Sequence, residues 1–514
     1  MKRSDDSMSK KARLFGSGFY TALCIVLAAA ASTAVAQEPP STGDALTASK
    51  ADAPPLRSPM EYRSEGGNLV VTMEARPTVV KVGPHQIAGA TYNGIYGGPV
   101  LRLKPGDTLH FRLVNHLHQI TNVHFHGLAV SPAGHGDDSM HMVAPGESWE
   151  YVIPIPNDHP PGIYWFHTHG HDFAERQVMG GLSGTLVIEG FQDEVPATKP
   201  LVERLIALKE FSPDGKGALN NVPKPVNGTV QNINGQFQPR IDIQPGETQL
   251  WRFSDQTANT YFRLQLEGHQ MTQVGRDARP ILHPEASSEI IIGPSERIDV
   301  LVTAGPTGQY RLLSEPTATG PAGDMFPAQV LATMAAVRDP DRPPPEPVGE
   351  LVVNAPKQQP IAGDRIDAQR IVVFSEDTVT GLFFINHQTF DPHRVDVRVP
   401  LGSIEEWTIR NSSEELHVFH IHQLPFQVLS INGKPVRFQG VQDTIDVPIH
   451  GEVKIRLAFT DPIIVGRFMF HCHILEHEDK GMMAMIEVYD PKAGPTAAGM
   501  KMSDGAKGMS HAGR

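Results

Sequence analysis

The feature that most constrains the fold is a pattern that occurs three times along the chain. In its first occurrence, Asn93-Gly94 precedes Pro105-Gly106 and an alternating apolar segment that ends at Asn115. Each occurrence combines tight turns with hydrophobicity of period two, which is typical of β-strands. The corresponding residues of the other occurrences are Asn234-Gly235, Pro245-Gly246 and Asp255, and Asn386, Leu401-Gly402 and Asn411. The repetition predicts an all-β protein with three related β-sandwich domains.

The length of the chain agrees with this division, because 514 residues exceed what a single hydrophobic core usually organises. A Pro-rich stretch at 339–347 is a natural linker before the third domain. We therefore predict domains at residues 59–195, 196–345 and 346–490. The segments 37–58 and 491–514 are predicted to be flexible ends.

The first 36 residues have the pattern of a secretory signal peptide. Lys10, Lys11 and Arg13 form a positive region, an apolar run follows, and Ala34-Val35-Ala36 is a plausible cleavage site. The apolar run is too short for a membrane anchor, and no other segment approaches the ~20 apolar residues that a spanning helix needs. The sequence predicts a periplasmic or secreted protein with no membrane span in its mature chain, and leaves the export route open.

Charge and cysteine content narrow the functional classes further. A formal net charge of −13 gives the chain no electrostatic footprint for nucleic acid or an anionic membrane. Of the two cysteines, Cys24 lies in the signal peptide, so Cys472 is alone in the mature chain. It can form no internal disulfide, and metal ligation is one reason for an exported protein to carry it.

Four histidine pairs of the form His-x-His lie within apolar β-patterns. Side chains at i and i+2 of a strand point to the same face, so each pair offers two imidazoles on one surface. His116 and His118 form a fifth pair, which we interpret as background in a polar turn. For any single pair, a buried structural role is as good an interpretation as metal binding. The four pairs are His124/His126, His167/His169, His420/His422 and His471/His473.

The repeat relates these pairs to one another. An offset of 296 residues maps His124 onto His420, and an offset of 304 maps His167 onto His471. The pairs thus occupy equivalent places in the first and third domains, and the second domain has none. A pseudo-symmetric interface between the outer domains would bring eight imidazoles together, which suits a cluster of three copper ions.

Cys472 lies between the members of the last pair, so strand alternation directs its sulfur to the opposite face, into the third domain. His417, His477 and Met482 are placed to join it. Two imidazoles, a thiolate and a weak axial thioether describe a blue-copper electron-transfer site. The first domain has Thr121 and Thr168 at the places of His417 and Cys472, so only the third domain can hold this site.

The segments HFHG, WFHTH, HVFHIH and HCHILEHEDKGMM resemble the four copper-ligand motifs of three-domain multicopper oxidases, the laccase-like family. The resemblance covers about residues 60 to 490 and departs from the family at Val418, where a proline is usual. It implies three cupredoxin-like Greek-key domains and four copper ions. His417, Cys472 and His477 would bind the type-1 copper, with Met482 as the axial ligand. His124 and His420 would bind the type-2 copper, and the type-3 pair would be held by His126, His167, His169, His422, His471 and His473.

The resemblance also implies a path for electrons and protons. A reducing substrate would give single electrons at an exposed edge of His477, and Cys472 would pass them to its neighbours His471 and His473. Four electrons would reduce O₂ to water. Asp137 and Glu478 resemble the acids that supply protons, although Asp138 competes with Asp137 for that role.

The electron donor is the least determined part. Phenols or aromatic amines are one hypothesis, and cuprous ion, for copper tolerance, is the alternative. Met500, Met502, Met509 and His511 of the tail suit Cu(I), unless these methionines are incidental. A non-catalytic cupredoxin scaffold is disfavoured because no ligand has been lost. A two-domain nitrite reductase is excluded by the third repeat.

Overall fold

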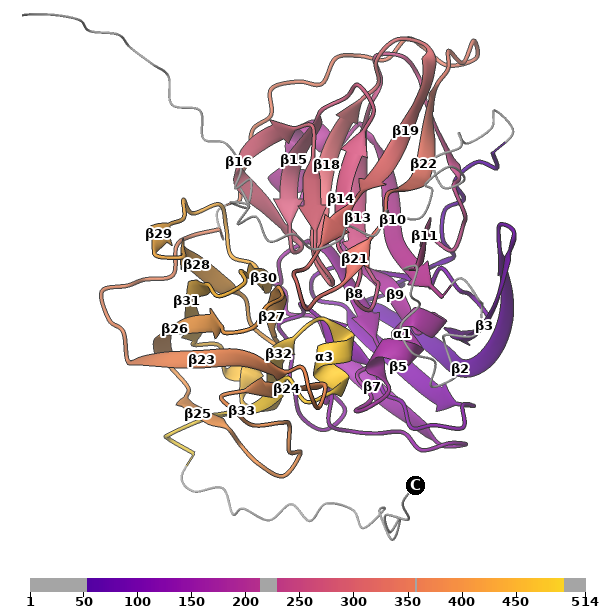
Figure 1. Ribbon diagram of the computed structural model, residues 1–514. Coiled ribbons are helices and arrows are strands. Elements are labelled where there is room, and N and C mark those ends of the chain that lie inside the picture. The colour runs from indigo at the N-terminus through magenta and orange to yellow at the C-terminus, as the bar shows by residue number, and fades with distance from the viewer. Residues whose placement is uncertain (1–52, 213–228, 356–357, 494–514) are drawn as a thin grey trace, which may run out of the picture. The chain divides into compact units, whose positions relative to one another are not determined.

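A computed structural model describes residues 53–212, 229–355 and 358–493 of the chain. The predicted signal peptide, almost all of segment 37–58 and the Met-containing end of the tail lie outside the described residues. Nearly all of the regular secondary structure in the described chain is β-strand, as Figure 1 shows, and the all-β prediction is confirmed. The predicted domain boundaries stay a prediction.

The first domain has a four-stranded and a five-stranded sheet. The four-stranded sheet has the order β3-β2-β5-β7, formed by His85–Tyr92, Asn68–Val82, Thr108–Asn115 and Ser148–Pro154. The five-stranded sheet has the order β1-β4-β9-β8-β6, formed by Glu61–Arg63, Val100–Leu103, Ser183–Ile188, Gly162–His167 and His124–His126.

The second domain repeats this arrangement, with six strands in place of four in one of its sheets. One sheet has the order β11-β10-β13-β18-β15-β16, formed by Val230–Ile233, Val202–Phe211, Thr248–Asp255, Arg297–Thr303, Met271–Arg276 and Arg279–Ser287. The other has the order β12-β22-β19-β14-β17, formed by Arg240–Ile243, Gln329–Ala336, Gly308–Glu315, Phe262–Leu266 and Ile290–Ile292. A small hairpin adds β20 (Thr317–Ala318) and β21 (Met325–Phe326).

The third domain has the same two layers. The first is β24-β23-β26-β31-β28-β29, formed by Leu382–Ile385, Ala368–Asp377, Ser403–Asn411, Glu452–Phe459, Phe426–Ile431 and Lys434–Pro435. The second is β25-β33-β32-β27-β30, formed by Val397–Pro400, Met483–Tyr489, Gly466–Cys472, His417–Ile421 and Thr444–Val447.

Strand pairing repeats in the three domains as well as strand order. In β3-β2-β5-β7, β11-β10-β13-β18 and β24-β23-β26-β31, the successive pairs are antiparallel, parallel and antiparallel. The opposite layers β4-β9-β8-β6, β12-β22-β19-β14 and β25-β33-β32-β27 also share one pattern, which is parallel, antiparallel and antiparallel. These crossed connections form the Greek-key sandwich that the family resemblance implied.

The repeated asparagine has a local physical reason. Asn93, Asn234 and Asn386 have φ of 55°, 52° and 52°, a left-handed conformation that asparagine tolerates better than most residues. In each domain the asparagine Oδ1 accepts a hydrogen bond from a main-chain N–H of the neighbouring long strand, at 2.8, 2.7 and 2.9 Å. The motif therefore ties the turn to the sheet in all three domains.

Each domain has its own hydrophobic core between its two sheets. Strand β31 illustrates the alternation that builds these cores, because every second residue from Val453 to Phe459 is buried. The strands with histidine pairs are different: all residues of β8 and β27 are buried. Both faces of these strands are covered, so their imidazoles face protein rather than solvent.

Short helices complete the fold. Helix α1 (Ala174–Gly180) follows β8 and α3 (Leu475–Asp479) follows β32, while α2 is Phe191–Glu194. Two 3₁₀ turns occupy Pro196–Thr198 and Pro462–Ile464. Among the described residues, no helix combines the length and the apolar character that crossing a bilayer requires.

Candidate metal centre

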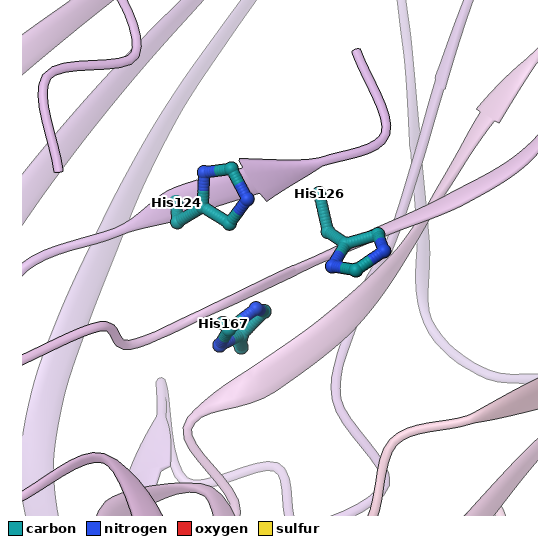
Figure 2. A group of neighbouring side chains, drawn as sticks. All are labelled: His124, His126 and His167. Atoms are coloured by element: carbon teal, nitrogen blue, oxygen red, sulfur yellow. The ribbon is translucent and has the colours of Figure 1, made fainter. Parts of the chain in front are cut away.

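The histidines of the first domain lie on two paired strands. His124 of β6 is directly opposite His167 of β8, and His126 is opposite Trp165. His169 follows two residues after His167, and all four imidazoles are fully buried. Figure 2 shows His124 and His126 on one segment and His167 on the next, with the three rings around a common space.

The third domain repeats this arrangement. His420 of β27 pairs with His471 of β32, and Phe419 pairs with Cys472. His422 directly follows the end of β27, and His473 directly follows the end of β32. All four imidazoles are again fully buried. Exposed His116 and His118 follow β5, away from these strands, as expected for a polar turn.

The two sets of four imidazoles meet across the boundary between the first and third domains. The His169 Nε2 and His471 Nε2 atoms are 3.3 Å apart. The rings of His124 and His422 stack with centroids 3.7 Å apart, and those of His126 and His420 stack at 3.8 Å. The structure thus brings together all eight histidines that the sequence singled out.

Two trios within the cluster combine rings of both domains, and other rings lie equally close, such as those of His420 and His422 with centroids 5.2 Å apart. His126, His167 and His473 form one trio, with centroids 5.0–6.0 Å apart. A second trio has centroids 4.9–5.3 Å apart and consists of His169, His422 and His471. His124 and His420 remain, 6.0 Å apart. Each trio takes two histidines from one domain and one from the other.

The unused nitrogens of this cluster test whether metal ions fit. His124 Nε2, His420 Nε2, His126 Nδ1, His167 Nε2 and both ring nitrogens of His473 are buried without a hydrogen-bond partner in the described chain. Leaving so many buried nitrogens unpaired would be costly, and metal ligation would satisfy them. Buried imidazoles with unpaired ring nitrogens suit copper ions, and the assignment of each histidine to one copper stays a prediction.

Burial also sets the protonation state that metal binding needs. Desolvation, followed by repulsion from neighbouring imidazoles, lowers the pKa of six of these histidines well below the usual value. They are therefore neutral at physiological pH, which is the form that binds a metal. The six are His126, His167, His169, His420, His422 and His473.

Acidic residues orient the rings from outside the cluster. The Nδ1 of His124 lies 3.0 Å from Asp137 Oδ2, and the main-chain N–H of Phe125 donates to Asp137 Oδ1 at 3.0 Å. Asp138 instead accepts from the main-chain N–H of Met140 and has no recorded contact with an imidazole among the described residues. Of the two competing aspartates, the geometry favours Asp137.

Glu478 of α3 lies beside the second trio. Its Oε2 is 3.0 Å from His471 Nδ1, and its Oε1 is 3.5 Å from His169 Nε2. Neither of these two contacts has the geometry of a hydrogen bond. His471 Nδ1 instead faces the Cys472 carbonyl oxygen, at 3.0 Å. Glu478 is therefore a buried carboxyl group next to the imidazoles, and neither of its oxygens has a hydrogen-bond partner among the described residues.

A separate group of ligands surrounds Cys472, on the face of β32 opposite to the cluster. The Cys472 Sγ atom is 3.7 Å from His417 Nδ1 and 3.6 Å from His477 Nδ1, and the two nitrogens are 3.1 Å apart. Met482 is fully buried, and its main chain is hydrogen-bonded to both Cys472 and His477. Burial raises the pKa of the Cys472 thiol, so the thiolate needs the charge of a bound cation.

The expectation of an exposed His477 edge is wrong. The residue is only 1% exposed. The Phe383 ring stacks on its imidazole with centroids 4.0 Å apart, and Glu415 Oε1 lies 3.1 Å from its Nε2. Strand alternation and motif spacing place His477 beside Cys472 but do not reveal what covers its outer edge.

Other residues around the site were also missed. Asp443 contacts His126 at 3.1 Å, and Ser413 Oγ lies 2.9 Å from His417 Nε2. Neither belongs to a histidine motif or to a repeated pattern, so no sequence signal distinguishes them from ordinary polar residues. They become visible only when the strands are assembled.

Comparisons with known proteins agree with this site. Models of the multicopper oxidase family match residues 75–193, 208–334 and 359–492. The chain belongs to the multicopper oxidase family, which makes it a copper-dependent oxidoreductase that reduces O₂. One type-1, one type-2 and two type-3 coppers are its cofactors, and the two ligand groups around Cys472 and between the outer domains fit them.

Three relatives illustrate the range of the family. The multicopper oxidase mco of Staphylococcus haemolyticus is 28% identical over 409 residues, which are 77% of this chain and 83% of the relative. The multicopper oxidase from Campylobacter jejuni, a metallo-oxidase, is 27% identical, covers 85% of this chain and 96% of its own, and has a TM-score of 0.72. The laccase-like CueO from Ochrobactrum sp., with oxidase activity towards lignin model compounds and lignosulfonate, is 25% identical, covers 84% and 100%, and has a TM-score of 0.71.

Proposed function

We propose that this multicopper oxidase takes its electrons from a small metal cation, with Cu(I) as the foremost candidate. The observation that carries this choice is the carboxylate at the type-1 site, where Glu415 Oε1 lies 3.1 Å from His477 Nε2. A cation held by Glu415 would be one side chain away from the type-1 ligand. The copper ions supply one-electron redox chemistry, while the protein side chains select the donor and deliver protons.

A second carboxylate supports a cation site. Glu376 of β23 is half-buried and interacts with Glu415, and it accepts a hydrogen bond from the main-chain N–H of Glu414 at 3.1 Å. Burial, together with the Glu415 carboxylate, raises the pKa of Glu376 to about 7. Two carboxyl groups this close repel each other when ionised, and a bound cation would relieve that repulsion.

The covering of His477 disfavours a bulky donor. The hairpin of β20 and β21 from the second domain is bonded to this region, because Leu416 N donates to Thr319 O at 2.7 Å. A Cβ atom at Gly323 would lie 2.9 Å from Glu415 Oε2, so the hairpin packs closely on the carboxylate. A flat aromatic donor would need the ring edge at Nε2 that Glu415 covers, whereas a metal ion needs only carboxylate oxygens.

Oxidation of phenols or aromatic amines is the second candidate. The laccase-like relative from Ochrobactrum supports it, since that protein oxidises lignin model compounds. The Campylobacter relative, a metallo-oxidase, supports the first. For this chain, the carboxylates of Glu415 and Glu376 near His477 support the cation donor.

The ligand assignment predicted from the motifs is part of this proposal. Electrons would pass from the Cys472 thiolate through its covalent neighbours His471 and His473, one of which belongs to each trio. Asp137 and Glu478 would hold the protons that water formation consumes, since each lies beside a ring of the cluster. We further propose that the protein is exported to the periplasm or secreted after removal of residues 1–36.

A comparison of donors tests the proposal. The purified, copper-loaded full chain would be assayed for O₂ consumption with Cu(I), Fe(II) and a substituted phenol. We expect Cu(I) to be the fastest donor, and Glu415→Gln to slow cation oxidation about 10–100-fold, in line with other groups that orient metal ligands. Glu452→Gln, at an exposed glutamate paired with Arg410, is the matched control. Faster turnover of the phenol than of either cation would reject a cation donor.

The tail is tested separately. Truncation after Asp490 removes Met500, Met502 and Met509, which lie outside the described residues. A specific loss of Cu(I) turnover would assign them a role in copper delivery. Equal rates with and without the tail would reject a role for it.

A further inference from the structure

The second domain has no predicted copper ligand, yet one of its side chains reaches the metal cluster. Arg297 is the first residue of β18, and its side chain is fully buried. Its guanidinium donates to both carboxylate oxygens of Asp443 in the third domain, from Nη1 at 2.7 Å and from Nη2 at 2.5 Å. Asp443 Oδ1 in turn lies 3.1 Å from Nε2 of His126 in the first domain. One buried chain of contacts therefore joins all three domains.

Asp443 orients two imidazoles by different atoms. Its carboxylate faces Nε2 of His126, which leaves Nδ1 of that ring without a partner in the described chain and directed to the cluster. Its main-chain carbonyl oxygen lies 2.8 Å from Nδ1 of His420, which leaves Nε2 of that ring unpaired. A displacement of Asp443 would thus disturb one ring of a type-3 trio and one ring of the type-2 pair.

The surroundings hold Arg297 in one geometry. Its guanidinium also donates to the Ser295 carbonyl oxygen at 3.1 Å and lies 3.4 Å from Asp277 Oδ1. The main-chain N–H groups of Asp443 and Thr444 point to Asp277 Oδ2, at 3.3 Å each. The arginine and the loop that carries Asp443 are therefore fastened to the same aspartate of the second domain.

Gly127 makes room for this contact. It follows His126 directly and has φ of 83°, in the left-handed region that favours glycine. A Cβ atom there would lie 2.7 Å from Arg297 Nη2 and 2.7 Å from Asp443 Oδ2. The glycine of the HFHG motif thus lets the guanidinium and the carboxylate meet beside the ligand.

Asp443 could instead be regarded as a metal ligand, because it groups with His126 and His420. Its hydrogen bonds argue against this. Both carboxylate oxygens are taken by a planar, permanently charged guanidinium, and Thr444 Oγ1 donates to Oδ1 at 3.0 Å. A carboxylate neutralised in this way is better suited to orienting a ring than to binding a metal.

We infer that Arg297 of the copper-free second domain is a positioning residue of the trinuclear copper site, which acts by holding Asp443 against His126 and His420. The second domain then contributes to the oxygen-reducing site without supplying a ligand. The inference depends on the copper cluster between the outer domains and is independent of which donor the enzyme uses.

Copper retention tests this inference with a matched pair of variants. Arg297→Lys keeps the charge but loses the two-pronged contact. Arg252→Lys is the control, because Arg252 is an equally buried arginine of the second domain with a two-pronged contact to Asp299, at 2.7 and 3.2 Å. Copper content would be measured during dialysis against increasing chelator, together with the blue colour of the type-1 site, the EPR signal of the type-2 copper and the melting temperature.

We expect both variants to lose thermal stability, and only Arg297→Lys to release cluster copper at about 10–100-fold lower chelator concentration while its type-1 colour stays. Its type-2 EPR signal should change as well. Equal copper retention in the two variants would overturn the inference. If Arg297→Lys does not fold, Asp443→Asn decides: it keeps the volume of the side chain and must produce the same selective loss of cluster copper, and full retention would again overturn the inference.

Discussion

The first and third domains have the same strand arrangement, but they carry different side chains at the position of the type-1 copper site. In the third domain, β27 and β32 place His417 and Cys472 side by side, and α3 adds His477. In the first domain, the equivalent residues Thr121 and Thr168 lie with their hydroxyl oxygens 3.1 Å apart. Both hydroxyls donate to Gln177 Oε1 of α1, each at 2.8 Å.

The comparison shows that the same position accepts either a metal site or a small hydrogen-bonded network. Hydroxyl and amide groups satisfy one another there, because donors and acceptors are balanced. A thiol and two imidazoles occupy this position in the third domain, where burial raises the pKa of the Cys472 thiol and lowers that of the His417 imidazole. A few side chains on one backbone frame therefore decide which domain holds the type-1 copper.

The largest effect is expected when the third domain is made to resemble the first. Cys472→Ser replaces the thiolate with a hydroxyl, which binds copper poorly at this site. We expect the blue colour to disappear, oxidation of every donor to stop, and one copper per chain to be lost. Absorption spectroscopy, O₂ consumption and metal analysis check these outcomes. Substantial oxidase activity in this variant would contradict the electron path through Cys472.

The next largest effect is expected when a carboxyl group that we propose to supply protons is removed. Glu478→Gln removes a titratable group beside His471 without changing its volume, so reduction of the type-1 copper should stay normal while O₂ consumption falls about 10–100-fold. Stopped-flow bleaching of the blue colour separates the two steps. Asp137→Asn should behave similarly, and Asp138→Asn should not. Equal effects of the two aspartate variants would remove the distinction that the geometry makes.

The free energy of unfolding should depend on pH through the acidic residues near His477. The neutral amide of Gln177, at the corresponding place in the first domain, cannot have this effect. The pKa of Glu376 is raised to about 7 in the folded protein, so the folded state binds more protons than the unfolded state between about pH 4.5 and 7. Its contribution to the free energy of unfolding must therefore fall as pH rises through this window. Because Glu376 is only partly buried, solvent screening reduces the effect to about 1 kcal/mol.

Glu376→Gln tests this sign. The free energy of unfolding of the variant and of the parent protein would be measured with denaturant at pH 5 and pH 7. The difference, variant minus parent, should be more positive at pH 7 than at pH 5. A parallel pH dependence of the two proteins would show that Glu376 titrates normally.

The smallest effect is expected in the network of the first domain. Thr121→Val removes one hydroxyl, but Thr168 still bonds to Gln177, so the free energy of unfolding should fall by only about 0.5–1 kcal/mol. Copper content and the blue colour should be unchanged, because no ligand is touched. Loss of copper in this variant would show that the network also supports the cluster.

The sequence was sufficient for the fold class and for the candidate ligands because both depend on short-range patterns. Residues two apart on a strand share a face, so the four pairs and the opposite orientation of Cys472 follow from alternation alone. The repeat then relates the first domain to the third. The asparagine turns are equally local, because their hydrogen bonds reach only the adjacent strand.

The tertiary structure decided what depends on residues far apart along the chain. His126 and Asp443 are separated by 317 positions, and Arg297 and Asp443 by 146, and no periodicity links such residues. The same is true of the contacts between imidazoles of the first and third domains, and of the cover that Phe383 and Glu415 place over His477. Local alternation determines which face a side chain occupies, whereas its partners across that face are known only once the three domains have packed together.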